Sequence, residues 1–249
     1  MDMIRAARII LFLGLVGLSP LAAYGRDLGP SHVPDDWCPS EKGDCERRSL
    51  AAFRAYAHRI NKTTLALTLR TGRKVLLSNP DDCQSADPRP GEGCEYFSLD
   101  FYFRQRGLFL ISVGRYEWVE WILVNDHTGH QTRLLGRPIF SPSGREFVVA
   151  INQGSSSGIA GAFEIWDLRS NTPARSFRFE PNAAIPLQGK ADWQGDDRIV
   201  LSYDDFPRGG PYDRAYTQTD TAVRDRNGWC VARREPPATN PVASAIRCP

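Results

Sequence analysis

Short runs of apolar and β-branched residues, each closed by turn-forming residues, cover most of the chain after residue 62. In residues 63–70, Leu65, Leu67 and Leu69 alternate with polar or small residues, so they share one face of an extended segment. The later runs are rich in Val, Ile, Phe, Tyr and Trp and are separated by Gly, Asn, Asp and Pro, which is typical of strands and turns. The expected strands are 63–70, 74–78, 96–103, 108–114, 117–125, 131–135, 147–151, 162–167, 175–179, 198–203, 216–224 and 228–233.

One segment before these runs has a helical period. Leu50, Phe53, Ala57 and Ile60 follow one another at spacings of 3, 4 and 3, which places them on one stripe of a helix. Asp44 precedes them as a suitable cap. We therefore predict a helix over 46–60, within an N-terminal extension over 26–62.

The β segments repeat weakly along the chain. Residues 122–129 match 163–170 at an offset of 41, and 143–149 match 196–201 at an offset near 53. Spacings of about 40 to 50 residues are typical of four-stranded propeller blades. The predicted fold is mainly β: a short β-propeller-like stack of about four antiparallel blades over 63–235, with one N-terminal helix. A two-sheet β-sandwich is the alternative. The expected blades are 96–135, 138–180 and 190–233, with half a blade at 63–78.

One of these repeats also resembles a known family. The run Arg137-Pro138-Ile139-Phe140-Ser141-Pro142-Ser143-Gly144-Arg145-Glu146-Phe147-Val148-Val149, followed by Phe163-Glu164-Ile165-Trp166-Asp167-Leu168, resembles the WD40-like β-propeller repeat of TolB-type periplasmic proteins. Ser143 stands where that repeat usually has Asp, and the match covers about 30 residues. The resemblance implies the periplasm and protein partners. Apart from it, Pro142 and Gly144 suit a tight turn, Phe140 and Trp193 suit packing between blades, and Asp167 can bond turn backbone.

The first 25 residues have the pattern of an export signal. Arg5 and Arg8 precede an apolar stretch of about 15 residues, and small residues at Ala23 and Gly25 suit a cleavage site. A retained membrane anchor is the alternative, but a span requires about 20 apolar residues. We expect cleavage after residue 25, a periplasmic or extracellular protein, and no stable membrane span afterwards.

Charge and cysteine content agree with export. The chain has 249 residues with 31 basic and 29 acidic side chains, and this balance does not suggest a nucleic-acid partner. The cysteines lie in neighbouring pairs, which favours structural disulfides that join neighbours and tie down a C-terminal tail over 236–249, although six cysteines allow many pairings. There is no Cys-x-x-Cys, and no Cys lies beside a His at ligand spacing, so neither a metal nor a cofactor is expected. The expected disulfide residues are Cys38, Cys45, Cys83, Cys94, Cys230 and Cys248.

The most unusual hexapeptide is residues 116–121. Glu117, Trp118 and Trp121 could form a ledge that binds a sugar or a cation, because aromatic faces attract both. The alternative is an edge strand whose glutamates oppose aggregation and whose tryptophans pack between blades. The histidines of His127-Thr128-Gly129-His130 are expected to lie in a solvent-facing turn. No metal site and no catalytic residue is assigned.

These observations predict an exported, non-enzymatic protein-binding or scaffold module, with the periplasm and protein partners implied by the resemblance. The alternative is a secreted hydrolase that acts on glycans, using Glu117 and Glu120 or an Asp of the loop 204–213. Because Glu117 and Glu120 point to opposite faces of a strand, that pair is unfavourable. An inhibitor or coat-like structural role is the third possibility, and the sequence does not indicate an oligomeric state.

Overall fold

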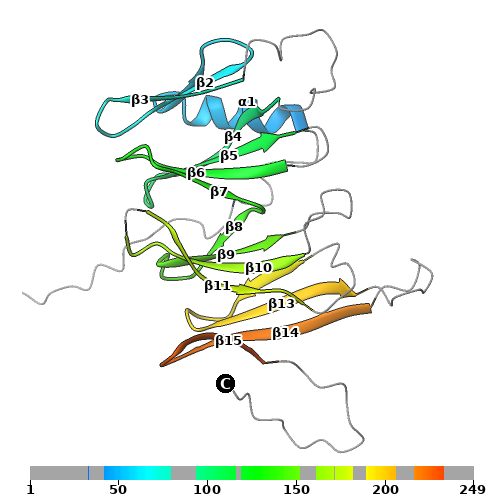
Figure 1. The fold of residues 1–249 in the computed structure, drawn as a ribbon. Helices are drawn as coiled ribbons and strands as arrows, with labels where there is room; N and C mark the ends of the chain where they lie inside the picture. The colour runs from blue at the N-terminus through cyan, green and yellow to red at the C-terminus, as the bar shows by residue number, and fades with distance from the viewer. Residues whose placement is uncertain are drawn as a thin grey trace, which may run out of the picture.

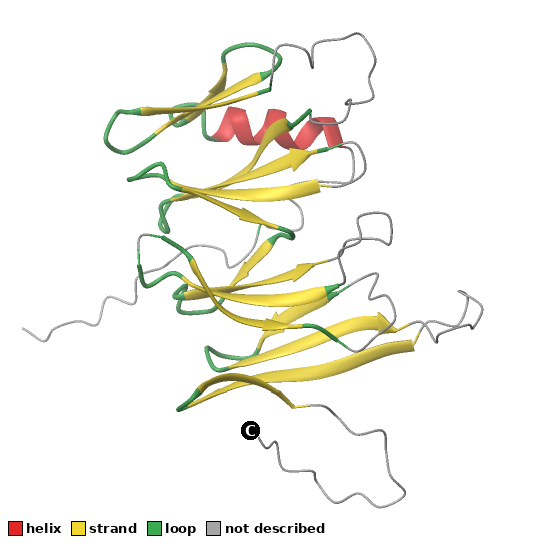
Figure 2. Ribbon diagram, in the orientation of Figure 1, coloured by secondary structure: helices red, strands yellow, loops and turns green. Residues whose placement is uncertain are grey.

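The computed structural model describes residues 33, 42–79, 94–115, 119–151, 161–170, 172–181, 189–205 and 216–232. This part of the chain contains one helix and fifteen strands, and the strands form four separate antiparallel sheets (Figures 1 and 2). The mainly β fold and the single helix are as predicted. The two-sheet sandwich is wrong, because the strands divide into four ladders.

The sheets follow one another in chain order, and each is built from consecutive strands. The helix is α1 (Lys42–Ala52), and the first sheet contains β1 (Ala57–Arg59), β2 (Thr64–Thr68) and β3 (Lys74–Ser78). The second sheet contains β4 (Tyr96–Phe103), β5 (Leu108–Gly114), β6 (Val119–Asn125) and β7 (Gln131–Leu134). The third sheet contains β8 (Pro138–Phe140), β9 (Glu146–Ile151), β10 (Ala162–Asp167) and β11 (Ala174–Phe179). The fourth sheet contains β12 (Lys190–Trp193), β13 (Arg198–Asp205), β14 (Tyr216–Asp225) and β15 (Gly228–Ala232).

Three clusters of buried apolar side chains lie between the four sheets and pack neighbouring sheets together. In β5, Phe109 and Ile111 face the first sheet, whereas Leu108 and Leu110 face the third. In β9, Val148 instead faces the fourth sheet. The second and third sheets are therefore buried on both faces, which explains why their strands read as almost continuous apolar runs.

The stack is open rather than closed into a ring. Figure 1 places the first and fourth sheets at opposite ends, and each described cluster joins neighbouring sheets. The outer face of the fourth sheet carries exposed Lys190, Asp192 and Thr219. A polar outer face is what a terminal unit of a stacked array requires, because no further unit covers it.

The predicted helix over 46–60 is wrong at both ends. The helix begins at Lys42 and ends at Ala52, and residues 57–59 form β1, which pairs with β2. Leu50 and Phe53 of the expected stripe do pack on the first cluster, but Ile60 is 55% exposed. The chain leaves the helix because the backbone groups around Ala57 pair with β2. The β structure thus begins before residue 63.

The strand predictions agree closely with the structure, except for the short first strands of three sheets. Besides β1, the strands β8 and β12 were not expected, and they exist because they pair with β9 and β13. Phe140 and Trp193 pack between sheets as predicted. Asp167 also accepts a hydrogen bond from the backbone N–H of Arg169 at 2.7 Å, as expected.

The cysteines in the described part are all engaged. Cys45, Cys94 and Cys230 are disulfide-bonded, and none of the described cysteines is free. Cys38, Cys83 and Cys248 lie outside the described residues, so the pairing of neighbours stays a prediction. The expected signal segment and C-terminal tail also lie outside that part of the chain.

Tight turns gather at one end of the strands, and we call this end the turn edge. It comprises the turn between β2 and β3 and two turns from each four-stranded sheet (Figure 2). In each of these sheets, one turn joins the first strand to the second and the other joins the third strand to the fourth, as in β4–β5 and β6–β7 of the second sheet. Glycines with positive φ lie in these turns, and Gly144 is one of them, as predicted.

The turn edge provides a controlled stability test at Gly107. A Cβ there would lie 2.7 Å from Oδ1 of buried Asp126, and φ is +66°. Gly72 has φ +80° with open space around it. We expect Gly72→Ala to cost about 1 kcal/mol of unfolding free energy and Gly107→Ala about 1–3 kcal/mol more. Urea unfolding measures both, and equal costs would contradict the packing around Asp126.

Candidate functional site

The predicted ledge is only partly within the described residues. Glu117 and Trp118 lie outside them. Trp121 is half-buried, donates its indole N–H to Oδ2 of Asp100 at 3.2 Å, and has the guanidinium carbon of Arg137 6.0 Å from its ring centroid. Trp121 also packs on the cluster between the second and third sheets, so its contacts are those of the packing alternative.

Asp100, which accepts the Trp121 hydrogen bond, is a buried carboxylate with several hydrogen-bond donors around it. The pairing of β4 with β5 shifts register between Leu99 and Phe101, and Asp100 lies at that bulge, 6% exposed. Besides Trp121, it accepts hydrogen bonds from Ser112 at 2.7 Å and Arg137 at 3.0 Å. These three donors satisfy the hydrogen-bonding capacity that the buried carboxylate would otherwise leave unmet.

Two glutamates beside residues 116–118 are also held in ion pairs. Glu95 pairs with Arg115 and Arg133, and Glu120 pairs with Arg133 at 3.1 Å and with Arg115 at 3.6 Å. Partial burial opposes ionisation of Glu95, but the hydrogen bond and charge of Arg133, together with Arg115, outweigh it and lower the pKa of Glu95. A lowered pKa suits a structural carboxylate rather than a general acid, which needs a raised one.

Other residues singled out in the sequence have ordinary surface roles. His127 and His130 are exposed in the turn between β6 and β7, as expected. Residues 206–213 of the loop 204–213 lie outside the described part. Within the described ranges, no three His, Cys, Asp or Glu side chains gather as metal ligands, and no helix there is long and apolar enough to cross a membrane.

The turn edge contains one structurally equivalent position in each of the last three sheets. At the end of the third strand, one residue donates its backbone N–H to a carbonyl of the first turn of the same sheet. These bonds run from Asp126 to Gly107 at 2.8 Å, from Leu168 to Arg145 at 2.7 Å, and from Arg224 to Asp197 at 2.8 Å. Because these backbone hydrogen bonds are equivalent, the three side chains can be compared directly. We call the contact between the first and second sheets the first junction, that between the second and third sheets the middle junction, and that between the third and fourth sheets the third junction.

At the first junction, the equivalent residue is a buried anion. Asp126 is 3% exposed and accepts hydrogen bonds from Arg70 of the first sheet at 2.7 Å and from the Tyr102 hydroxyl at 2.6 Å. Burial and then Asp126 raise the pKa of Tyr102. At the third junction the signs are reversed, since Arg224 pairs with buried Glu146 of the third sheet. Both junctions are thus joined by a partly buried ion pair.

At the turn edge of the middle junction, the described residues form no such pair. Here the equivalent residue is Leu168, and the nearby cation is Arg106, from the turn between β4 and β5. Nε and Nη1 of Arg106 are buried and have no hydrogen-bond partner within the described part of the chain. The guanidinium carbon lies 4.6 Å from the ring centroid of Phe140 in β8. Burial lowers the pKa of Arg106.

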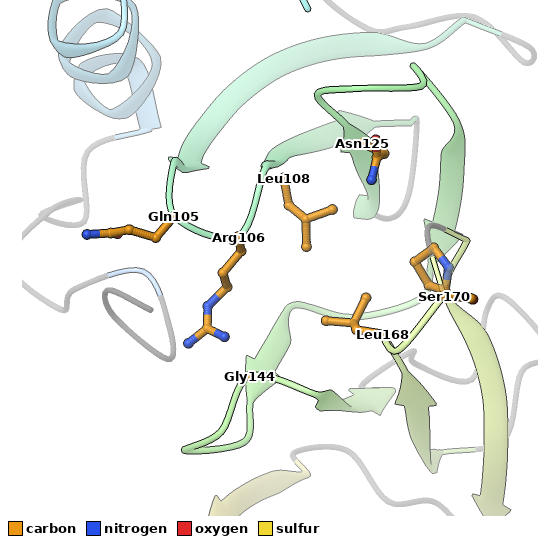
Figure 3. Close-up of a pocket in the computed structure, with 8 residues that line it drawn as sticks. Gln105, Arg106, Leu108, Asn125, Gly144, Leu168 and Ser170 are labelled. Carbon is orange, nitrogen blue, oxygen red and sulfur yellow. The ribbon is translucent and has the colours of Figure 1, made fainter. Parts of the chain in front are cut away.

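Arg106 lines a cavity of about 210 Å³ between the second and third sheets. In Figure 3, Leu108 and Leu168 face one another across the cavity, and the Arg106 side chain runs toward the turn that holds Gly144. The remaining lining residues are Gln105, Asn125, Ser170 and Pro173.

Asn125 adds a second donor to this cavity. Its Oδ1 accepts backbone N–H bonds from His127 and Thr128, both at 2.9 Å, which fixes the orientation of the amide. The amide nitrogen is consequently turned toward the cavity (Figure 3). A guanidinium beside a cavity can hold a hydrogen-bond acceptor or an anion, so this cavity is the candidate site. Nothing in the sequence pattern distinguished Arg106.

Comparisons with known proteins do not show a family for this chain. No family model matches it, and no curated protein matches it. The crystal structure of TolB from Acinetobacter baumannii is similar at 16% identity and a TM-score of 0.27, over 70% of this chain and 38% of that chain. The chain thus matches well under half of that protein's length. The fold described above rests on this chain's own strand pairing, and the WD40-like repeat stays a prediction.

Proposed function

We propose that this chain is an exported, non-enzymatic protein-binding or scaffold module that works in the periplasm and binds its partner at the turn edge. The observation that carries the proposal is half-buried Arg106, which lines a cavity and whose Nε and Nη1 are buried without a hydrogen-bond partner in the described part of the chain. A buried donor without a partner costs free energy, and a binding partner that supplies an acceptor recovers it.

Two further observations support the proposal. The disulfide-bonded Cys45, Cys94 and Cys230 fit an oxidising compartment, as does the expected signal segment. Glycan hydrolysis needs two carboxyl groups across a pocket, one with a raised pKa. By contrast, Glu120 is ion-paired, and the pKa of its neighbour Glu95 is lowered.

Site-specific photocrosslinking tests the proposal. A photoreactive amino acid replaces Gln105, which is exposed on the rim of the cavity, in the full chain exported to a bacterial periplasm. The matched control replaces Thr219, which is exposed on the outer face of the fourth sheet. We expect a discrete protein adduct from position 105 and none from position 219. No adduct at either position, or equal adducts at both, would count against binding at the turn edge.

An activity assay tests the non-enzymatic part. We expect the purified mature chain to release no reducing sugar from a bacterial cell-wall polysaccharide preparation. Release by the wild type that disappears in Glu120→Gln would instead favour the glycan hydrolase.

A further inference from the structure

We propose that the cavity at the middle junction binds a carboxylate from an acidic segment of the protein partner, with the Arg106 guanidinium as its counter-charge. This inference rests on the proposed function and names the chemistry that the partner must supply at that site.

The comparison between junctions is the first support. The first and third junctions each contain one acidic and one basic side chain, Asp126 with Arg70 and Glu146 with Arg224. Among the described residues, the turn edge of the middle junction has the basic member alone, because Leu168 occupies the position equivalent to Asp126; the Arg137–Asp100 pair lies elsewhere between these two sheets. A carboxylate from outside the chain would complete at this junction the pairing that the chain itself provides at the other two.

The walls of the cavity favour a carboxylate over a larger, more highly charged anion. Its exposed lining is mainly polar, and Leu108, Leu168 and Pro173 add apolar atoms that suit the methylene groups of a Glu or Asp side chain. Arg106 is the one cationic side chain among the described lining residues, and its single charge matches that of a monoanion. Phosphate recognition more often uses several donors and charges together.

The cavity lies at the surface of the molecule, where a partner protein can supply the anion for Arg106. Gln105 and Ser170 on its rim are exposed, so a segment of another protein can reach it along the turn edge. Phe140 lies beneath the guanidinium and holds it in place. A preorganised cation of this kind loses little conformational entropy when the anion binds.

NMR titration of the ¹⁵N-labelled mature chain, with its disulfides intact, tests the inference. The Nε–H signal of Arg106 is assigned by its absence in Arg106→Met. The probes are sodium acetate, inorganic phosphate, a blocked heptapeptide with one central glutamate, and the same peptide with glutamine. Ionic strength is held constant with chloride. We expect saturable shifts with acetate and the glutamate peptide, and binding at least about tenfold weaker for the glutamine peptide and for Arg106→Met.

Leu168→Glu provides the second variant. It keeps Arg106 but places a carboxylate within the chain at the middle junction, so it should compete with the probes and abolish the acetate shift. Leu168→Gln is its neutral control and should retain the shift.

Three outcomes would overturn the inference: no saturable shift in the wild type, binding of phosphate without acetate, or equal binding of the two peptides. Equal binding would mean that the cavity does not select the partner's carboxylate. Each of these outcomes is independent of the crosslinking result, because a partner can contact position 105 without placing a carboxylate on Arg106.

Discussion

Phe140→Ala is expected to lower the free energy of unfolding by about 3–5 kcal/mol. The ring is fully buried, and its centroid lies 4.8 Å from that of Phe103 in the second sheet and 5.7 Å from that of Phe147 in the third. Its removal leaves a cavity in the cluster that joins these two sheets and takes away the surface on which Arg106 rests. Urea unfolding at pH 7, followed by tryptophan fluorescence, measures the change.

Two variants control for Phe140→Ala. Phe140→Leu keeps most of the apolar volume and should cost about 1.5 kcal/mol or less. Phe179→Ala removes a half-buried ring from β11, whose centroid is 6.4 Å from that of Phe163, and should cost about 1–2 kcal/mol. A loss below about 1 kcal/mol for Phe140→Ala would contradict its central position between the sheets.

Asp126→Ala is expected to cost about 2–3 kcal/mol. It removes the acceptor of both Arg70 and the buried Tyr102 hydroxyl, and so opens the junction between the first and second sheets. The expected cost is below that of breaking a fully buried pair, because the Arg70 side chain is 51% exposed and can be rehydrated.

Asp167→Ala is the matched control in the next sheet. Asp167 also lies at the end of a third strand, but its ion-pair partner Arg169 is 71% exposed and comes from the same turn. We expect a loss of less than about 1 kcal/mol. Equal losses for Asp126→Ala and Asp167→Ala, measured by urea unfolding, would show that the Asp126 contacts do not hold the two sheets together.

Much of this fold was accessible from the sequence because its strands are apolar and its turns contain glycine. The expected strands 96–103, 108–114 and 162–167 match β4, β5 and β10 residue for residue. β8 and β12 were missed because a strand of three or four residues that contains Pro138 or Lys190 has little β character of its own. Their extended form depends on pairing with β9 and β13, which a local pattern does not contain.

The predicted helix also shows that a local sequence pattern does not contain strand pairing. Ala57 and Ile60 have the spacing of a helical stripe, yet they lie in and beside β1. The stripe was correct for Leu50 and Phe53, which pack on the first cluster. Pairing with β2, encoded several residues later, decided the conformation of the second half.

The candidate site was not predictable for a related reason. Arg104-Gln105-Arg106-Gly107 is a polar turn, and such turns are normally solvated. Arg106 is half-buried because its guanidinium lies over Phe140, 34 residues further along the chain. Its lack of a counter-charge becomes visible only when Asp126, Leu168 and Arg224 are recognised as equivalent, which requires their backbone hydrogen bonds.

The most direct test of the unpaired middle junction is a double-mutant cycle between positions 106 and 168. The free energy of unfolding is measured in urea for the wild type, Arg106→Met, Leu168→Glu and the double variant. We predict that Leu168→Glu is tolerated better when Arg106 is present, by at least about 1 kcal/mol of coupling. A coupling indistinguishable from zero would mean that Arg106 does not present an available charge to this cavity, and would contradict the site proposed for the partner.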